Sequence, residues 1–267
     1  MEMLKKNMKI IISLTFFGLV SFASYSEAGL TYEEKIKLEA SSFNQELSPT
    51  EIKKRAIALK EWSSIDYFEK DIQKFIDADG ISLPPENAIL FIGSSSIAMW
   101  KSLEKDMHPF QVINRGFGGA HIAHVNNYLK EIVLPYRPKG IVFFCGSNDI
   151  YALKSPEEVF QDFLYFFQFI KSNLPSTKVF VIGIKPSIAR DYQKKKQVKW
   201  NESVGALATQ DDNLFLIDVR PAMLLESGKT NSELFIEDGL HMNSKGYELW
   251  TKLVRFYLES NFKLEKS

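Results

Sequence analysis

The chain has 267 residues, of which 45% are apolar, and its 33 basic residues balance 33 acidic ones. This length and apolar content suit a globular chain with one sizeable core. The formal net charge is zero and the basic residues are spread along the chain, so the sequence lacks the electrostatic footprint of a nucleic-acid-binding protein.

The first 28 residues have the pattern of a signal peptide. Three lysines precede an apolar run over residues 10–23, and Ser26 and Ala28 fit a small-x-small cleavage site. The run is shorter than the roughly 20 residues that span a bilayer. We therefore expect an exported protein, periplasmic or extracellular, with no stable membrane span after cleavage. The single cysteine, Cys145, allows no intramolecular disulfide and is expected to be a buried small hydrophobe.

Residues 29–85 are expected to form a helical extension packed on the main domain. Ser48, Pro49 and Glu51 have the pattern of a capping box that starts a helix over residues 48–78. Apolar residues then recur at near-helical spacing and predict one core-facing side: Ile52, Ile57, Leu59, Trp62, Ile65, Phe68, Ile72 and Phe75.

Residues 86–267 are predicted to form one α/β domain. Five apolar runs read as strands covered on both faces: 88–92, 110–113, 140–145, 179–184 and 214–219. Helical patterns alternate with them, at residues 122–132, from Ser155 onward, and over 190–209 and 244–260. This alternation predicts a parallel sheet of about five strands with helices on both faces.

Four polar segments are placed where a parallel sheet binds its ligands, at the carboxyl ends of the strands. Segments 93–96, 114–119 and 146–149 each follow a predicted strand, and segment 238–241 precedes the C-terminal helix. All four are therefore expected to meet on one rim of the sheet.

The segments contain the groups that ester cleavage requires. Asp238, three positions before His241, can accept a hydrogen bond from Nδ1 and leave Nε2 free to take a proton from a hydroxyl. The serine triplet 94–96 can supply that hydroxyl, although a serine before a helix is also a common N-cap and composition does not choose among the three. Asn148 is either a turn residue or a donor to an oxyanion.

The glycines of segment 114–119 have two interpretations. They can form a tight turn, or they can let a backbone N–H approach a ligand closely. A phosphate loop is disfavoured because no Lys-Ser or Lys-Thr pair follows.

Together, the four segments resemble the blocks of the SGNH, or GDSL-type, hydrolase superfamily, in the same order. The resemblance implies a flavodoxin-like three-layer sandwich and a serine esterase with no metal or organic cofactor. It makes Ser95 the nucleophile, with Asp238 and His241 completing the catalytic triad. It also assigns the oxyanion hole to the N–H of Ser95, to Gly119 and to Asn148.

One departure from that pattern is visible. The Gly-Asp-Ser of the family is Gly93-Ser94-Ser95 here, so the acidic residue beside the nucleophile is absent. That residue is not the triad acid, so the departure affects the substrate more than the chemistry. We expect cleavage of short-chain or acetyl esters of a small molecule, a glycan or a lipid. The alternatives are a lysophospholipase and a noncatalytic carbohydrate-binding or surface protein. An ordinary α/β-hydrolase would need glycine in place of Ile97.

Other polar and aromatic residues are given structural roles. His121 and His124 lie three positions apart, but no further ligand follows at metal-binding spacing, so a metal site is not expected. The aromatic stretch 160–169 is assigned to the core rather than to an acyl groove. Lys185 and Arg190 are expected in a solvated loop, with contact to a polar substrate as the alternative. The sequence indicates no oligomeric state.

Overall fold

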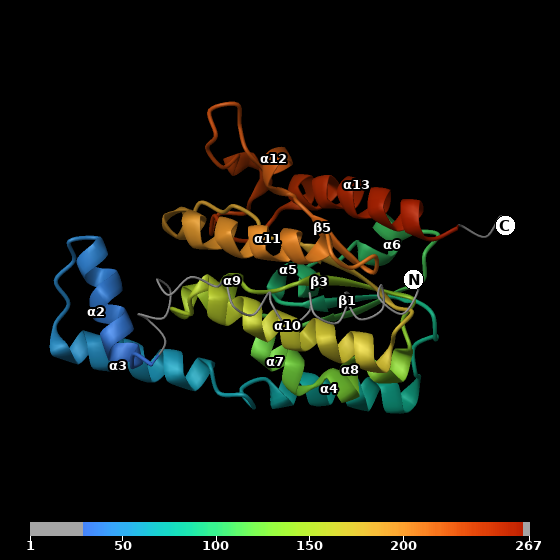
Figure 1. The fold of residues 1–267 in the computed structure, drawn as a ribbon, viewed down its shortest axis with the longest axis horizontal. Coiled ribbons are helices and arrows are strands. Elements are labelled where there is room, and N and C mark those ends of the chain that lie inside the picture. The colour runs from blue at the N-terminus through green and yellow to red at the C-terminus, as the bar shows by residue number, and fades with distance from the viewer. Residues whose placement is uncertain (1–28, 264–267) are drawn as a thin grey trace, which may run out of the picture.

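In the computed structural model, which describes residues 29–263, five parallel strands form one sheet between two layers of helices (Figure 1). The strands are β1 (Ile89–Gly93), β2 (Val112–Gly116), β3 (Gly140–Phe144), β4 (Lys178–Ile182) and β5 (Leu214–Ile217). Their order in the sheet is β2-β1-β3-β4-β5. The predicted three-layer α/β fold is thus confirmed, and the predicted signal peptide, residues 1–28, lies outside the described residues.

One face of the sheet is covered by helices from the middle of the chain. These are α7 (Ile122–Asn127), α8 (Leu129–Ile132), α10 (Pro156–Asn173) and α11 (Lys194–Ala208). Because side chains alternate across a strand, Leu90 and Ile92 of β1 face this layer, and they share a core cluster with Phe163, Phe166 and Trp200. The phenylalanines of the aromatic stretch of α10 therefore pack in or against the core, as predicted, whereas Tyr165 is exposed.

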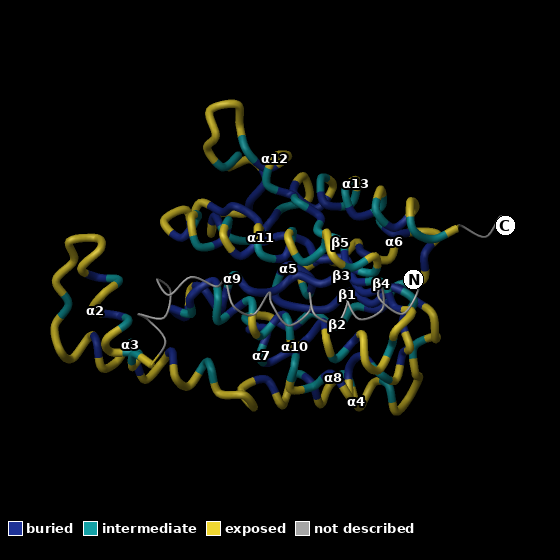
Figure 2. The backbone as a smooth tube through the Cα atoms, viewed as in Figure 1, coloured by how far each residue is buried: buried dark blue, intermediate teal, exposed yellow. Residues whose placement is uncertain are grey.

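The opposite face is covered by α6 (Leu103–Met107), α12 (Arg220–Met223) and α13 (Ser244–Asn261). Ile89 and Phe91, the other residues of β1, pack in this layer with Trp250, Val254 and Leu258 of α13. Figure 2 shows the strands buried between the two layers. Within residues 29–263, no helix combines the length and apolar character needed to cross a membrane.

The N-terminal part of the chain differs from the single long helix that was predicted. It forms α2 (Tyr32–Ser42), α3 (Pro49–Trp62) and α4 (Glu69–Ile81). The Ser48–Glu51 capping box is present, but α3 ends at Trp62, where serines follow that can bond locally and compete with the helix. Two residues assigned to the core-facing side, Ile57 and Ile65, are exposed.

The α2–α3 pair lies at one end of the molecule in Figure 1. It packs through Ile36, Ile52 and Leu59 against Ala152 and Leu153, while α4 packs near α8. A division of the chain into an extension, residues 29–85, and a domain, residues 86–267, stays a prediction.

Smaller boundary differences affect two functional segments. Strand β2 runs to Gly116, so Asn114 and Arg115, which were assigned to a loop, belong to the sheet. The helix predicted over 190–209 begins as a 3-10 turn, Asp191–Gln193, before α11. Two short helices, α5 (Ser95–Ala98) and α9 (Ser147–Tyr151), start directly at the carboxyl ends of β1 and β3.

Candidate active site

The sheet order places a reversal of the chain connections at the carboxyl ends of β1 and β3. Strand β2 lies on one side of β1 and β3 on the other, so the connections leave in opposite directions, and this reversal is where open α/β sheets bind ligands. Gly93 ends β1 with φ +139°, and an added Cβ would lie 2.0 Å from the carbonyl oxygen of Phe144. The close approach lets the next residue, Ser94, donate its N–H to that same carbonyl at 2.9 Å.

Three of the predicted residues form a continuous chain of contacts on this rim. Ser95 Oγ lies 2.9 Å from His241 Nε2, and His241 Nδ1 lies 2.5 Å from Asp238 Oδ2. An ionised carboxylate can only accept, so Nδ1 carries the proton and Nε2 is free to accept one from the hydroxyl. The sequence left three serines open, and the structure places Ser95 against the imidazole.

Asp238 is held in place by its own turn. Its Oδ1 accepts the backbone N–H groups of Leu240 and His241, each at 2.8 Å. Partial burial raises the pKa of Asp238, but hydrogen bonds from the His241 ring and from the two N–H groups outweigh burial and hold the pKa below its usual value. Asp238 is therefore ionised near neutral pH, as is required to stabilise an imidazolium.

Two of the three predicted oxyanion donors, Gly119 and Asn148, lie at one loop. Ser95 is the first residue of α5, where an N–H has no partner within the helix. Gly119 has φ +83°, a conformation that suits glycine. Asn148 is 7% exposed and donates Nδ2–H to the carbonyl of Ala120 at 3.0 Å, so its carboxamide lies beside the residue that follows Gly119. One N–H of the carboxamide is then left for a ligand.

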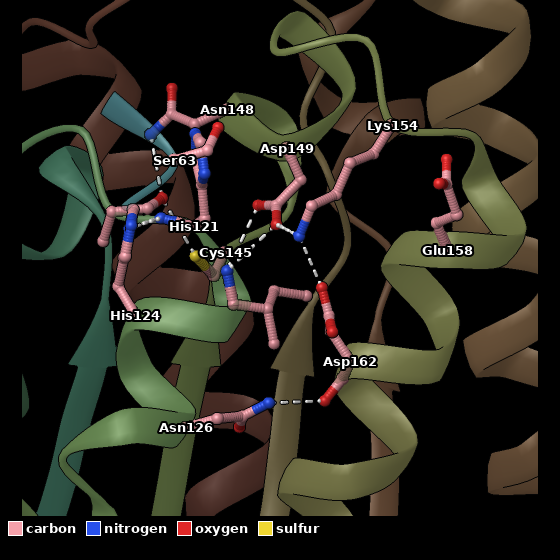
Figure 3. Close-up of polar contacts among 12 residues, drawn as sticks. Ser63, His121, His124, Asn126, Cys145, Asn148, Asp149, Lys154, Glu158 and Asp162 are labelled. Carbon is pink, nitrogen blue, oxygen red and sulfur yellow. Dashed lines mark hydrogen bonds and ion pairs between the residues drawn. The ribbon is translucent and has the colours of Figure 1, made fainter. Parts of the chain in front are cut away.

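An ionic network around the buried carboxylate of Asp149 supports this loop (Figure 3). The Asp149 carboxylate, fully buried, accepts the N–H of Ile122 at 3.1 Å and pairs with Lys154 at 3.4 Å. Lys154 also pairs with Asp162 at 2.6 Å. Although burial acts to lower it, these two carboxylates hold the pKa of Lys154 above its usual value. The network ties α9, α7 and α10 together and so fixes the segment between Gly119 and Ile122.

His121 and His124 are stacked, with ring centroids 4.7 Å apart, inside this packed region. Burial lowers the pKa of His121 to about 3 and that of His124 to about 4, so both rings are neutral at physiological pH. His124 Nδ1 accepts the N–H of His121, and its Nε2 lies 3.0 Å from the carbonyl of Ser64. Within the described part of the chain, no group of three or more His, Cys, Asp and Glu side chains could hold a metal.

The α3–α4 connection contacts the same loop, which the sequence did not indicate. Trp62 Nε1 donates to the carbonyl of Gly119 at 3.0 Å, and the Trp62 ring lies 4.4 Å from that of His121. Phe68 packs edge-on against Phe117 at 5.2 Å. Trp62 was interpreted only as a core residue, and no motif marks its contact with Gly119.

The expectation that Lys185 and Arg190 lie in a solvated loop is wrong, because they are only 4% and 7% exposed. The loop after β4 folds onto the His241 turn, where the N–H of Ala189 donates to the carbonyl of Gly239 at 3.1 Å. Lys185 Nζ donates to the carbonyl of Leu240 at 2.5 Å, and burial lowers its pKa to about 7. Both cations therefore lie beside the candidate site.

The fold and the contacts of Ser95, His241 and Asp238 define the class of protein: an SGNH-type serine hydrolase architecture. The family comparison agrees with this class. The chain belongs to the GDSL-like Lipase/Acylhydrolase family, whose model matches residues 93–249. The protein is thus a member of a family of hydrolases that act on ester bonds.

Relatives are distant in sequence and similar in fold. The chain is 26% identical over 165 residues to an N-acylneuraminate cytidylyltransferase from Escherichia coli O18:K1:H7 (strain RS218 / NMEC), a match covering 60% of this chain but 37% of that protein. A candidate platelet activating factor from Streptococcus pneumonia has a TM-score of 0.66 at 24% identity, covering 76% of this chain and 98% of its own. A carbohydrate esterase family 3 protein from Talaromyces cellulolyticus has a TM-score of 0.53 at 15% identity, covering 65% and 96%.

Proposed function

We propose that this protein is a serine esterase that removes short acyl groups, such as acetyl, from carbohydrate esters. The observation that carries the proposal is the unbroken contact chain from Ser95 through His241 to Asp238. The 2.9 Å between Ser95 Oγ and His241 Nε2 lies in the range at which a proton moves between nucleophile and base. The contact of His241 Nδ1 with Asp238 orients the imidazole for that transfer.

In the proposed reaction, His241 Nε2 takes the proton of Ser95 as Oγ attacks the ester carbonyl. The negative oxygen that forms is stabilised by the N–H groups of Ser95 and Gly119 and by the Asn148 carboxamide. The tetrahedral intermediate collapses when His241 returns the proton to the leaving alcohol. Water, activated by the same imidazole, then releases the acid and restores Ser95.

Carbohydrate esters are proposed as substrates on two supports. The E. coli relative is named for an activity on N-acylneuraminate, a sugar acid. The Talaromyces protein is described as a carbohydrate esterase. A lysophospholipase is the alternative outcome for the same chemistry. A series of activated esters from acetyl to palmitoyl distinguishes them, since a preference for long chains would favour the lipid.

The test of the chemistry is covalent labelling. A fluorophosphonate should form an adduct on Ser95, and Ser95→Ala and His241→Ala should each lose almost all hydrolysis of an activated acetyl ester. Ser94→Ala is the matched control and should keep the parent rate. Labelling elsewhere, or full activity in Ser95→Ala, would refute the proposal. Binding of glycans without labelling would favour the noncatalytic alternative.

We further propose export to the periplasm or the extracellular space. The support is the signal pattern of residues 1–28. Expression of the full chain in a bacterial host, followed by mass measurement of the secreted protein, should give an N-terminus near Gly29. An uncleaved chain confined to the cytoplasm would contradict export.

A further inference from the structure

Arg190 lies between two parts of the candidate site, the Ser147–Asn148 segment and the turn from Asp238 to His241. Its Nη1 donates to Ser147 Oγ at 2.8 Å, and Ser147 immediately precedes Asn148, the candidate oxyanion donor. On the other side, the neighbouring Ala189 is bonded to Gly239, inside the turn from Asp238 to His241. The guanidinium is therefore fixed beside the groups that would surround the reacting ester.

Arg190 is a buried cation without a carboxylate. The residue is 7% exposed, and its guanidinium contacts the Ser147 hydroxyl and the ring face of Tyr151, 4.6 Å from the guanidinium carbon. Within residues 29–263, no Asp or Glu forms an ion pair with it. Burying an unpaired charge is costly, because the lost hydration is not replaced.

Elsewhere this chain supplies carboxylates even to cations that are only partly buried. Arg115 pairs with Asp79 at 2.5 Å, and Lys154 pairs with Asp149 and Asp162. Lys185 also lacks an ion pair, but an ammonium can lose its proton, whereas a guanidinium stays charged at any physiological pH. Arg190 is therefore the buried cation for which a ligand would supply the missing negative charge.

One neighbour of Arg190 is exposed to solvent. Tyr151, on whose ring the guanidinium rests, is 38% exposed and lies 6.1 Å from the Trp62 ring. Guanidinium offers several N–H donors in a planar fork, of which the contact with Ser147 uses one. A planar fork suits the bidentate binding of a carboxylate or a phosphate.

We propose that Arg190, with Ser147 and Tyr151, forms a subsite for an anionic group on the acylated substrate, either a carboxylate or a phosphate. This inference rests on the proposed esterase function and narrows its substrate to acylated sugar acids or acylated sugar phosphates. Neutral glycan esters would then react without the contribution of this subsite.

The test compares three acetyl esters that differ in one group: a singly acetylated methyl glucoside, the matching glucuronoside and the matching glucoside phosphate. The wild-type kcat/KM should be higher for one charged ester than for the neutral one by about ten- to a hundredfold, the range of a charge-assisted hydrogen bond. A preference for the glucuronoside would indicate a carboxylate site, and a preference for the glucoside phosphate would indicate a phosphate site.

Arg190→Met should abolish this preference, mainly through a higher KM for the preferred charged ester, and any loss of kcat/KM for the neutral ester should be much smaller than that for the charged one. Arg190→Lys should keep part of it. Arg137→Met is the matched control, because Arg137 is exposed and precedes β3, at the amino ends of the strands and away from the candidate site. That control should retain the full preference.

Two results would overturn the subsite: equal kcat/KM for all three esters in the wild type, or an equal loss for all three in Arg190→Met. If Arg190→Met does not fold, inhibition of the wild type decides: glucuronate or glucose phosphate should inhibit hydrolysis of the neutral ester, and glucose should not. Failure of the esterase proposal would appear separately, as neutral-ester hydrolysis that survives Ser95→Ala. Calorimetric binding of the charged esters to Ser95→Ala would then still test Arg190.

Discussion

Replacing Trp62 with Phe should slow acylation of Ser95 while leaving substrate affinity nearly unchanged. The substitution keeps an aromatic ring beside His121 but removes the indole N–H that donates to the Gly119 carbonyl at 3.0 Å. A neutral hydrogen bond contributes about 0.5–1.5 kcal/mol. If that energy keeps the Gly119 loop in its transition-state position, its loss lowers the acylation rate by about two- to tenfold.

The assay is the pre-steady-state burst with an activated acetyl ester, because the burst rate reports acylation alone. KM and the melting temperature are measured on the same variants. Trp200→Phe is the matched control, since Trp200 is fully buried in α11 and its indole N–H has no partner within the described residues. That variant should lower stability without slowing the burst.

The reasoning is refuted if Trp62→Phe keeps the parent burst rate. It is also refuted if both tryptophan variants slow the burst by the same factor, because the effect would then come from general loosening of the core. A rise in KM with an unchanged burst would instead make Trp62 a residue that contacts the substrate.

Three further outcomes are expected. Asn148→Ala should lower kcat by about a hundred- to a thousandfold with little change in KM, measured by steady-state ester hydrolysis. Asp238→Asn should lower kcat by up to about four orders of magnitude by favouring the wrong tautomer of His241; a loss under tenfold would contradict this role. The pKa of Lys185 is about 7 in the folded chain, against an ordinary value of 10.5. Between these two pH values the unfolded chain binds one more proton at Lys185 than the folded chain does. The free energy of unfolding should therefore rise with pH across this window. Lys185→Met should flatten that rise in urea unfolding, and an unchanged slope would contradict it.

Much of the site could be predicted because its parts follow strands. Apolar runs buried on both faces locate the strands, and the carboxyl ends of parallel strands share one edge. That rule alone brings segments 93–96 and 146–149 together. The other two triad candidates, Asp238 and His241, lie in one turn. They are three positions apart and hydrogen-bond to each other, so this contact is local in the sequence. Hydrogen bonds between residues close in sequence and the strands of a regular sheet can both be predicted from the sequence.

The environments of Lys185 and Arg190 could not be predicted in the same way. Both residues follow a strand in a polar stretch, and such stretches usually face water. Their burial depends on contacts with residues more than 40 positions away, Leu240 for Lys185 and Ser147 for Arg190. Hydrophobic periodicity does not indicate whether a loop folds across the site. The break after Trp62 was missed for a related reason, because near-helical spacing continues through a turn that tertiary contacts stabilise.

The loop that holds Gly119 is supported from outside the segment that the family model matches. Trp62 bonds Gly119, the carbonyl of Ser64 faces His124, and Phe68 packs on Phe117, whereas the matched segment begins at residue 93. In this chain, the candidate oxyanion loop therefore depends on contacts from the α3–α4 connection. Changes in residues 62–68 are therefore expected to alter the acylation rate through the Gly119 loop, while the candidate nucleophile, base and acid stay the same.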